Sequence, residues 1–234
     1  EIRNCDWSSD VCSSDLVVGL FIATPGQWRS HDMAPVRERY LMSQLAALDA
    51  RLEALNIPLL YLETRDFEDI PSLFAGLCEA LHIERVHANR EYGWNEKKRD
   101  EAVASLLHAN NVAFAQYLDQ TIIAPGLTTG GGTPYTVFTP YKRRWLALWQ
   151  QEPVFAYPAP ARRQTTPRLP EDLRQPLPAA QALNNWPTGE KKAQHKLQHF
   201  CDDSIHAYHE RRDLPAHDGT SGLSAELCAG VLST

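Results

Sequence analysis

Four short apolar runs alternate along the chain with longer segments in which apolar residues recur every three or four positions. The short runs are rich in aliphatic and aromatic residues, as strands are, and their apolar density indicates strands that are covered on both faces. They span residues 17–24, 58–64, 85–91 and 112–119.

The segments between these runs have helical periodicity. One helix is expected after Pro35, which suits a first helical position, a second after Pro71, and a more polar third from Glu96 to Asn110. In the first, apolar residues recur at steps of three and four at Val36, Tyr40, Leu41, Leu45, Leu48, Leu52 and Leu55, and in the second at Leu73, Phe74, Leu77, Cys78 and Leu81. In the third, Val103, Leu106 and Leu107 are expected to face inward. This alternation predicts an α/β fold with a Rossmann-like, doubly wound parallel sheet.

The organisation changes after about residue 150. Eight of the 16 prolines lie between Pro153 and Pro187, which is typical of an extended connection between domains. Beyond it, a helix is expected on Ala193, Leu197, Phe200, Ile205 and Tyr208. We therefore predict an α/β domain over 16–148, a linker over 149–190 and the beginning of a helical domain over 191–234.

Composition and charge exclude several classes of protein. The 234 residues carry a net charge of -6, which gives no bulk argument for nucleic-acid binding. No apolar run approaches the roughly 18 residues of a membrane span. The five cysteines form no CxxC pair and no cluster at metal-ligand spacing, so we expect reduced thiols, a cytoplasmic protein and no metal site.

Four motifs carry a resemblance to a known family. They are "LFIATPGQWRSHDMAP", "EYGWNEKKRD", "VFTPYKRRW" and "RRDLPAHDGTSGLSAEL". In this order and at these separations, the chain from about Leu16 onward resembles the N-terminal half of the DNA photolyases of the folate-containing class. The resemblance implies an antenna domain, the start of an all-α flavin domain, and the cofactors FAD and 5,10-methenyltetrahydrofolate. It also implies a monomer that repairs cyclobutane pyrimidine dimers in damaged DNA, using light and no acid–base catalytic residue.

The N-terminal segment departs from that family. The family's chains begin with a strand of the form W-F-R-x-D-L-R-x-x-D, which in the sheet is the middle strand, and nothing like it precedes Leu16. Residues 5–16, "CDWSSDVCSSDL", instead resemble a translated sequencing adapter. We therefore treat residues 1–15 as non-native, and we expect this chain to be an incomplete and inactive fragment of its parent enzyme.

Three residues match the antenna site of the family. Asn95 and Glu96 match the positions that hold the pterin of the folate, and His31 matches a histidine that borders the same pocket. A carboxylate beside an amide complements the donors and acceptor of a pterin edge. The structural alternative is that Asn95 caps a helix and Glu96 favours its dipole, while His31 is a solvated loop residue.

A second group of residues matches the flavin site. Thr220, Ser221, Gly222, Leu223 and Ser224 match the segment that binds the phosphates of FAD, and Tyr208 matches an aromatic contact upstream. The alternative is an ordinary helix start with Ser224 as the N-cap. In the family an arginine often stands in the place of Gly222, so its absence here removes a charged contact to the flavin.

Two other functions remain compatible with the sequence. Cryptochrome-like blue-light photoreceptors share these motifs and lack the repair pocket. The second is an unrelated α/β nucleotide-binding module, for example one that resembles electron-transfer flavoproteins. Such a module would have a complete sheet and no helical continuation of this type.

Overall fold

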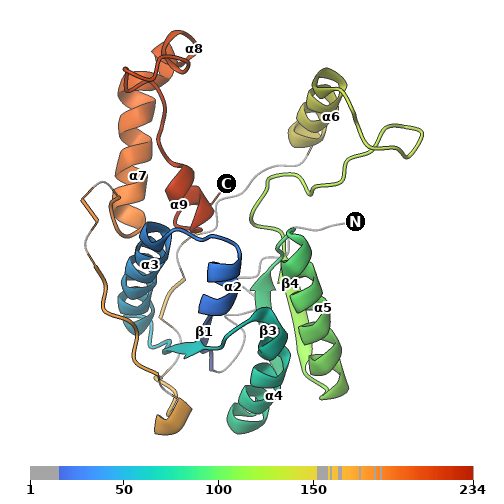
Figure 1. Ribbon diagram of the computed structural model, residues 1–234, viewed down its shortest axis with the longest axis vertical. Coiled ribbons are helices and arrows are strands. Elements are labelled where there is room, and N and C mark those ends of the chain that lie inside the picture. Colours follow the sequence, from blue (N-terminus) through green and yellow to red (C-terminus); the bar gives the residue numbers. More distant parts are fainter. Residues whose placement is uncertain are drawn as a thin grey trace. The chain divides into compact units, whose positions relative to one another are not determined.

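The structure is a computed structural model and describes residues 16–151, 158, 160–162, 165–173, 175–181, 183–184 and 186–233 (Figure 1). Of the predicted adapter-derived residues, only Leu16 is among them. Contacts within the chain group it into two units: one contains Thr64–Arg163, and the other combines Val18–Glu63 with Gln164–Ser233. The domain boundaries expected from the sequence stay a prediction.

The unit that begins at Val18 contains the first pair of strands. The strands β1 (Gly19–Ala23) and β2 (Leu59–Glu63) are parallel, in register from Gly19 opposite Leu59 to Ala23 opposite Glu63. Two helices connect them, α2 (Pro25–Ser30) and α3 (Pro35–Glu53), and each has proline in its first turn, where the missing amide costs nothing. The core of the pair is formed by Ala23, Met42, Leu45 and Tyr61.

The unit that begins at Thr64 contains the second pair. Its strands β3 (Arg85–Asn89) and β4 (Ala113–Tyr117) are also parallel, and α5 (Trp94–Ala109) connects them. The short helix η1 (Phe67–Asp69) and α4 (Ile70–Leu81) precede the pair, and α6 (Phe138–Gln151) follows it. Val103 and Leu107 are buried on α5, as their spacing predicts.

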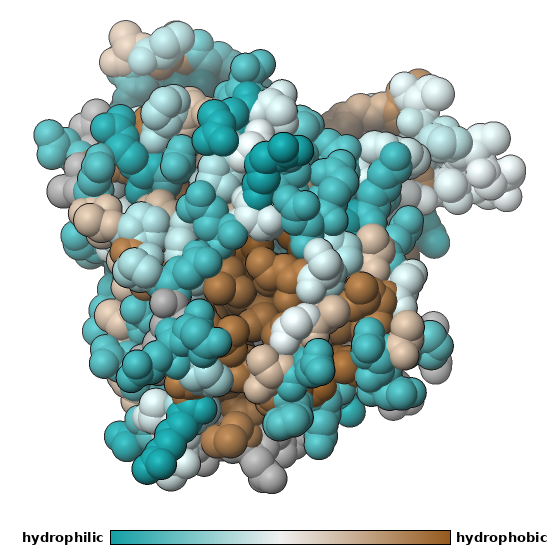
Figure 2. Space-filling view, turned by 60° about the horizontal axis from the view of Figure 1, so that its bottom comes forward, coloured by the Kyte–Doolittle hydropathy of each residue, from teal (hydrophilic) through white to brown (hydrophobic). Residues whose placement is uncertain are grey.

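The strand predictions are confirmed to within two residues at each end, and so is the α/β class. Each sheet has two strands, and among the described residues no third strand is bonded to either pair. Coverage on both faces is wrong for β1, β3 and β4, which are mostly half-exposed, whereas β2 is largely buried. Apolar side chains are accordingly visible at the surface (Figure 2).

The C-terminal part of the chain is helical, as expected. After the short helix η2 (Glu171–Leu173), one helical segment runs through α7 (Glu190–His199), η3 (Phe200–Ser204), η4 (Ile205–Ala207) and α8 (Tyr208–Arg211). Because η3 is a π-turn, it accommodates the step of five residues between Phe200 and Ile205. A loop then leads to α9 (Ser224–Cys228).

The sequence analysis missed two helices, α2 and α6. None of the helices in the described ranges is long and apolar enough to cross a lipid bilayer.

Candidate functional site

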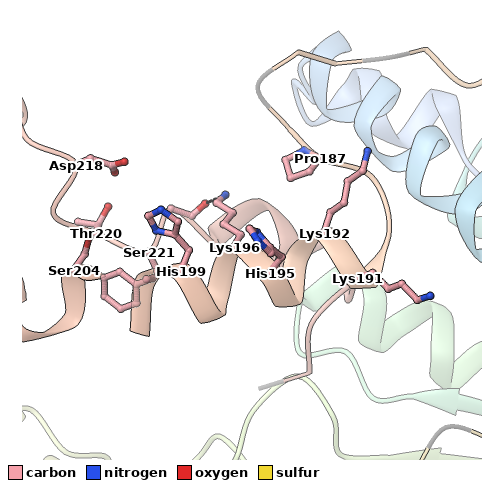
Figure 3. Close-up of a pocket in the computed structure, with 12 residues that line it drawn as sticks. Pro187, Lys191, Lys192, His195, Lys196, His199, Ser204, Asp218, Thr220 and Ser221 are labelled. Carbon is pink, nitrogen blue, oxygen red and sulfur yellow. Dashed lines mark hydrogen bonds between the residues drawn. The ribbon is translucent and has the colours of Figure 1, made fainter. Parts of the chain in front are cut away.

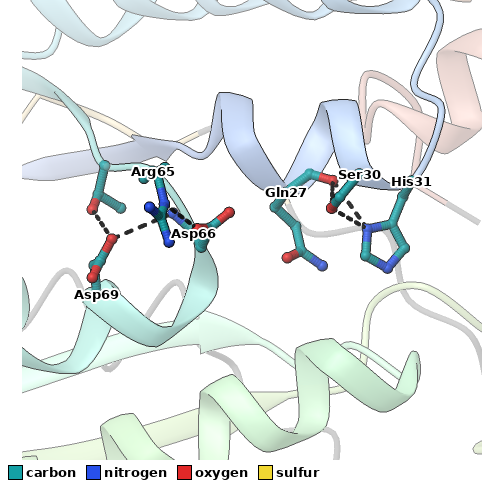
Figure 4. A network of polar contacts seen from close by, with 7 residues as sticks. Gln27, Ser30, His31, Arg65, Asp66 and Asp69 are labelled. Carbon is teal, nitrogen blue, oxygen red and sulfur yellow. Dashed lines mark hydrogen bonds and ion pairs between the residues drawn. The ribbon is translucent and has the colours of Figure 1, made fainter.

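His31 lies at the end of α2, exposed to solvent. Its Nδ1 lies 3.0 Å from the Gln27 carbonyl oxygen and 3.0 Å from Ser30 Oγ, and Ser30 Oγ itself donates to the Gln27 carbonyl at 2.9 Å (Figure 4). The ring is therefore oriented by the last turn of its own helix. That arrangement leaves the imidazole accessible, so its role as a folate contact stays a prediction.

Asn95 and Glu96 lie in the first turn of α5 and are half-buried. The helix begins at Trp94 after Gly93, whose backbone is extended and provides no side-chain cap. The alternative that Asn95 is the N-cap is therefore wrong. Glu96 does lie in the first turn, where its charge favours the helix dipole. The role of both residues as folate contacts stays a prediction.

An ionic network fixes the same end of α5. The guanidinium of Arg99 donates to Glu91 at 2.5 Å and to Asp100 at 2.7 and 2.9 Å, and Gln116 of β4 donates to the second oxygen of Asp100 at 2.8 Å. Arg99 also lies 4.9 Å from the centroid of the Phe67 ring. Burial lowers the pKa of Arg99, but the bonds to the two carboxylates outweigh it and raise the pKa overall. The network thus ties α5 to the residues before it and to β4.

The flavin-type motif lies beside a pocket of about 670 Å³, in the unit that contains α7 (Figure 3). Thr220, Ser221 and Gly222 line it, as their match predicts. Leu223 and Ser224 do not line it: Leu223 is buried, and Ser224 is the first residue of α9. The N-cap of α9 is Leu223, so the alternative that Ser224 caps this helix is wrong.

Tyr208 is not in the pocket lining and is exposed. Its ring packs edge-on against Phe200, which does line the pocket, with 6.2 Å between the ring centroids. The Cζ atom of Arg212 lies over the Tyr208 ring, 5.9 Å from its centroid. Tyr208 therefore adjoins the pocket through Phe200, and direct contact with a flavin stays a prediction.

The sequence analysis missed the basic side of the pocket, which α7 provides. Lys196 points to the loop that carries Thr220 and Ser221, whereas Lys191 and Lys192 lie at the other end of α7 (Figure 3). The signal was available, because the basic residues recur on the helix at steps of three and four. The residues from α7 that line the pocket are Lys191, Lys192, His195, Lys196 and His199.

Lys196 is held by two bonds across the pocket wall. Its Nζ donates to the Gly222 carbonyl at 2.6 Å and to Glu226 Oε1 at 2.9 Å. Glu226 is fully buried, and among the described residues its Oε2 has no hydrogen-bond partner. Burial and the nearby charge of Glu226 raise the pKa of Tyr40 on α3. A carboxylate in such a place requires a cation, and Lys196 is the one that contacts it.

The pocket's composition suits an anion. Three lysines outnumber its one acid, Asp218, and the hydroxyls of Thr220 and Ser221 add hydrogen-bond donors. A diphosphate carries the charge and the acceptor oxygens that this lining complements. Among the residues that the structure describes, no group of three or more His, Cys, Asp or Glu side chains suits a metal ion.

Comparisons with known proteins point in one direction. The family described as DNA photolyase matches residues 11–162. A deoxyribodipyrimidine photo-lyase of Vibrio cholerae is 35% identical over an alignment of 227 residues, and the match covers 94% of this chain and 48% of the relative.

Solved structures agree. The crystal structure of a bacterial class III photolyase from Agrobacterium tumefaciens has a TM-score of 0.77 and 26% identity, covering 98% of this chain and 48% of its own. A Synechocystis cryptochrome has a TM-score of 0.70 at 19% identity over 97% of this chain and 50% of its own, which shows the fold alone. The chain thus spans about half the length of each of these relatives.

Proposed function

The chain belongs to the DNA photolyase family, and we propose that it is the N-terminal part of a deoxyribodipyrimidine photo-lyase that repairs cyclobutane pyrimidine dimers in damaged DNA with light. The observation that carries the proposal is the basic, hydroxyl-lined pocket at Thr220–Gly222, which lies where the family motif predicts a flavin phosphate site. Identity to a photo-lyase across 94% of the chain supports the same activity.

The residues of this chain have binding and orienting roles in that reaction. When bound, reduced FAD would supply an electron to the dimer, and 5,10-methenyltetrahydrofolate would supply absorbed light energy. Thr220 and Ser221, which line the pocket, would donate hydrogen bonds to the flavin phosphates, and the lysines of α7 would offset their charge. No side chain of this chain has to exchange a proton with the dimer, so the chain contributes no catalytic residue.

The antenna contacts are the finer part of the proposal. Glu96 would accept hydrogen bonds from the pterin edge and Asn95 would complement its carbonyl, and His31 is proposed as a further folate contact. The half-buried position of Asn95 and Glu96 supports this, since both remain accessible at a helix start that the Arg99 network holds in place.

The proposed cellular location and oligomeric state follow from the same activity. We place the enzyme in the cytoplasm as a monomer, in agreement with the three described cysteines, Cys78, Cys201 and Cys228, all of which are free thiols. The 234-residue chain alone is proposed to be inactive, because it spans only about half the length of its relatives.

The test is repair by the full-length protein that contains this chain. Purified with reduced FAD, it should convert cyclobutane dimers in an oligonucleotide to intact pyrimidines under blue light and leave them unchanged in the dark. A cryptochrome-like photoreceptor would bind FAD and undergo photoreduction without repairing dimers. That result would overturn the proposal and favour the photoreceptor.

A further inference from the structure

Lys196 lies beside residue 222, where the flavin motif of this chain lacks a charged side chain. Gly222 occupies the position at which the family motif often carries arginine, and it contributes no side chain to the pocket. The Lys196 ammonium lies against this residue, 2.6 Å from the Gly222 carbonyl oxygen. A Cβ atom on residue 222 would lie 3.5 Å from Lys196 Cε and 3.6 Å from its Nζ. The lysine therefore occupies the space into which a side chain at 222 would project.

The backbone at this position also favours glycine. Gly222 has φ +60, in the left-handed region, where a residue with a Cβ atom is strained. The loop thus combines a conformation that suits glycine with a cation that arrives from another helix. Lys196 and Gly222 are 26 positions apart in the chain, so the two features act together only in the folded structure.

The ammonium of Lys196 keeps capacity for a ligand. An ammonium has three N–H donors, and within the described part of the chain two of them are used, for the Gly222 carbonyl and for Glu226. The side chain is 30% exposed and lines the pocket, whereas Glu226 is fully buried behind it. Glu226 therefore fixes the lysine from the closed side and leaves its remaining donor to the open side.

From this geometry we infer that Lys196, held by the buried carboxylate of Glu226, is the cation that binds the diphosphate of the dinucleotide in this pocket. It takes over the charge that Gly222 does not provide. The neighbouring hydroxyls of Thr220 and Ser221 bind the same group, while Lys191 and Lys192 lie farther along α7 and add only a diffuse positive field. The identity of the ligand as a flavin dinucleotide rests on the proposed function, but the role of Lys196 toward a diphosphate does not.

The experiment must separate binding by Lys196 from its pairing with Glu226. Lys196→Gln alone leaves a buried carboxylate without its cation, so a loss of binding in that variant has two explanations. The double variant Lys196→Gln/Glu226→Gln removes both charges and keeps groups that can hydrogen-bond to each other. Glu226→Gln keeps the lysine without its counter-ion. Lys97→Gln on α5 removes one positive charge outside the pocket and serves as the matched control.

Affinity is measured by titrating the apo form of the full-length protein with FAD and, separately, with inorganic pyrophosphate. We expect Lys196→Gln and the double variant to lose about ten- to a hundredfold in affinity for both ligands. Lys97→Gln should stay within about threefold of the parent, whereas Glu226→Gln, which keeps the lysine but removes the carboxylate that holds it, should lose less affinity than Lys196→Gln does. If the double variant binds both ligands as the parent does, Lys196 is only the counter-ion of Glu226 and the inference is wrong.

The two ligands also separate this inference from the proposed function. If the Lys196 variants lose pyrophosphate affinity but the parent does not bind FAD, the anion site is confirmed and the proposed flavin function is wrong. If the parent binds FAD and all four variants bind it equally, the flavin function stands and the inference fails.

Discussion

At the start of α5, Asn95 and Glu96, two of the three residues predicted to contact folate, are neighbours in the sequence, whereas at the flavin-type pocket Lys196 comes from a helix remote in the sequence from the hydroxyls of Thr220 and Ser221. The first site is a local motif on a helix that an arginine network stabilises. The second acquires its charge from a helix that the motif does not include. The family motif therefore indicated the hydroxyls of the pocket but not its basic side chains, which lie on another segment.

The largest expected difference between the two regions concerns how much of each site this chain contains. The 234-residue chain should bind FAD with a dissociation constant above about 1 µM, because the pocket meets only the phosphate end of the ligand and leaves the ring without a cover. The full-length protein should bind FAD at least about a hundredfold more tightly. Fluorescence titration of both proteins measures this. A submicromolar constant for the short chain would show that its pocket is already the whole site.

The region around the start of α5 should depend strongly on the half-buried Arg99. Arg99→Met leaves Asp100 and Glu91 without their cation, and because these groups are partly exposed we expect a loss of about 2 kcal/mol in local stability. Amide hydrogen exchange of α5 should accelerate by roughly thirtyfold. Lys97→Met, an exposed neighbour on the same helix, is the control and should change exchange little. Equal exchange rates in both variants would mean that the network does not hold α5.

A smaller effect should follow from restoring an arginine at the flavin motif. In the Lys196→Gln/Glu226→Gln background, Gly222→Arg should recover about tenfold in FAD affinity, because the guanidinium enters the space that Lys196 vacated. The gain is limited by the strain of a side chain at φ +60, roughly 1 kcal/mol. Gly222→Ala carries the same strain without the charge and should recover nothing. If Gly222→Ala recovered FAD affinity, or if Gly222→Arg did not, the inference that Lys196 replaces a charge at residue 222 would be wrong.

The strands and the longer helices could be predicted from the sequence because their signals are local. Apolar runs located β1 to β4, and Pro35 marked the start of α3. Prediction failed where a residue type that favours N-caps does not cap the helix. Asn95 and Ser224 are such residue types, yet α5 and α9 begin after Gly93 and Leu223 without a side-chain cap.

The pocket could be predicted only in part, since Thr220 and Ser221 belong to a motif and Lys196 does not. The pairing of Lys196 with Glu226 depends on how α7 packs beside α9, and no residue spacing within either helix predicts this pairing.

The account rests on two sites with separate tasks, an antenna at Glu96 and a flavin site at Lys196. The most direct test is an action spectrum of dimer repair by the full-length protein, with folate added back, for the parent and for Glu96→Ala. Removing this carboxylate should weaken folate binding about ten- to a hundredfold, so the folate band should disappear while repair driven by light that reduced flavin absorbs persists. If the variant keeps the full folate band, or if repair is lost at every wavelength, the division of tasks is wrong.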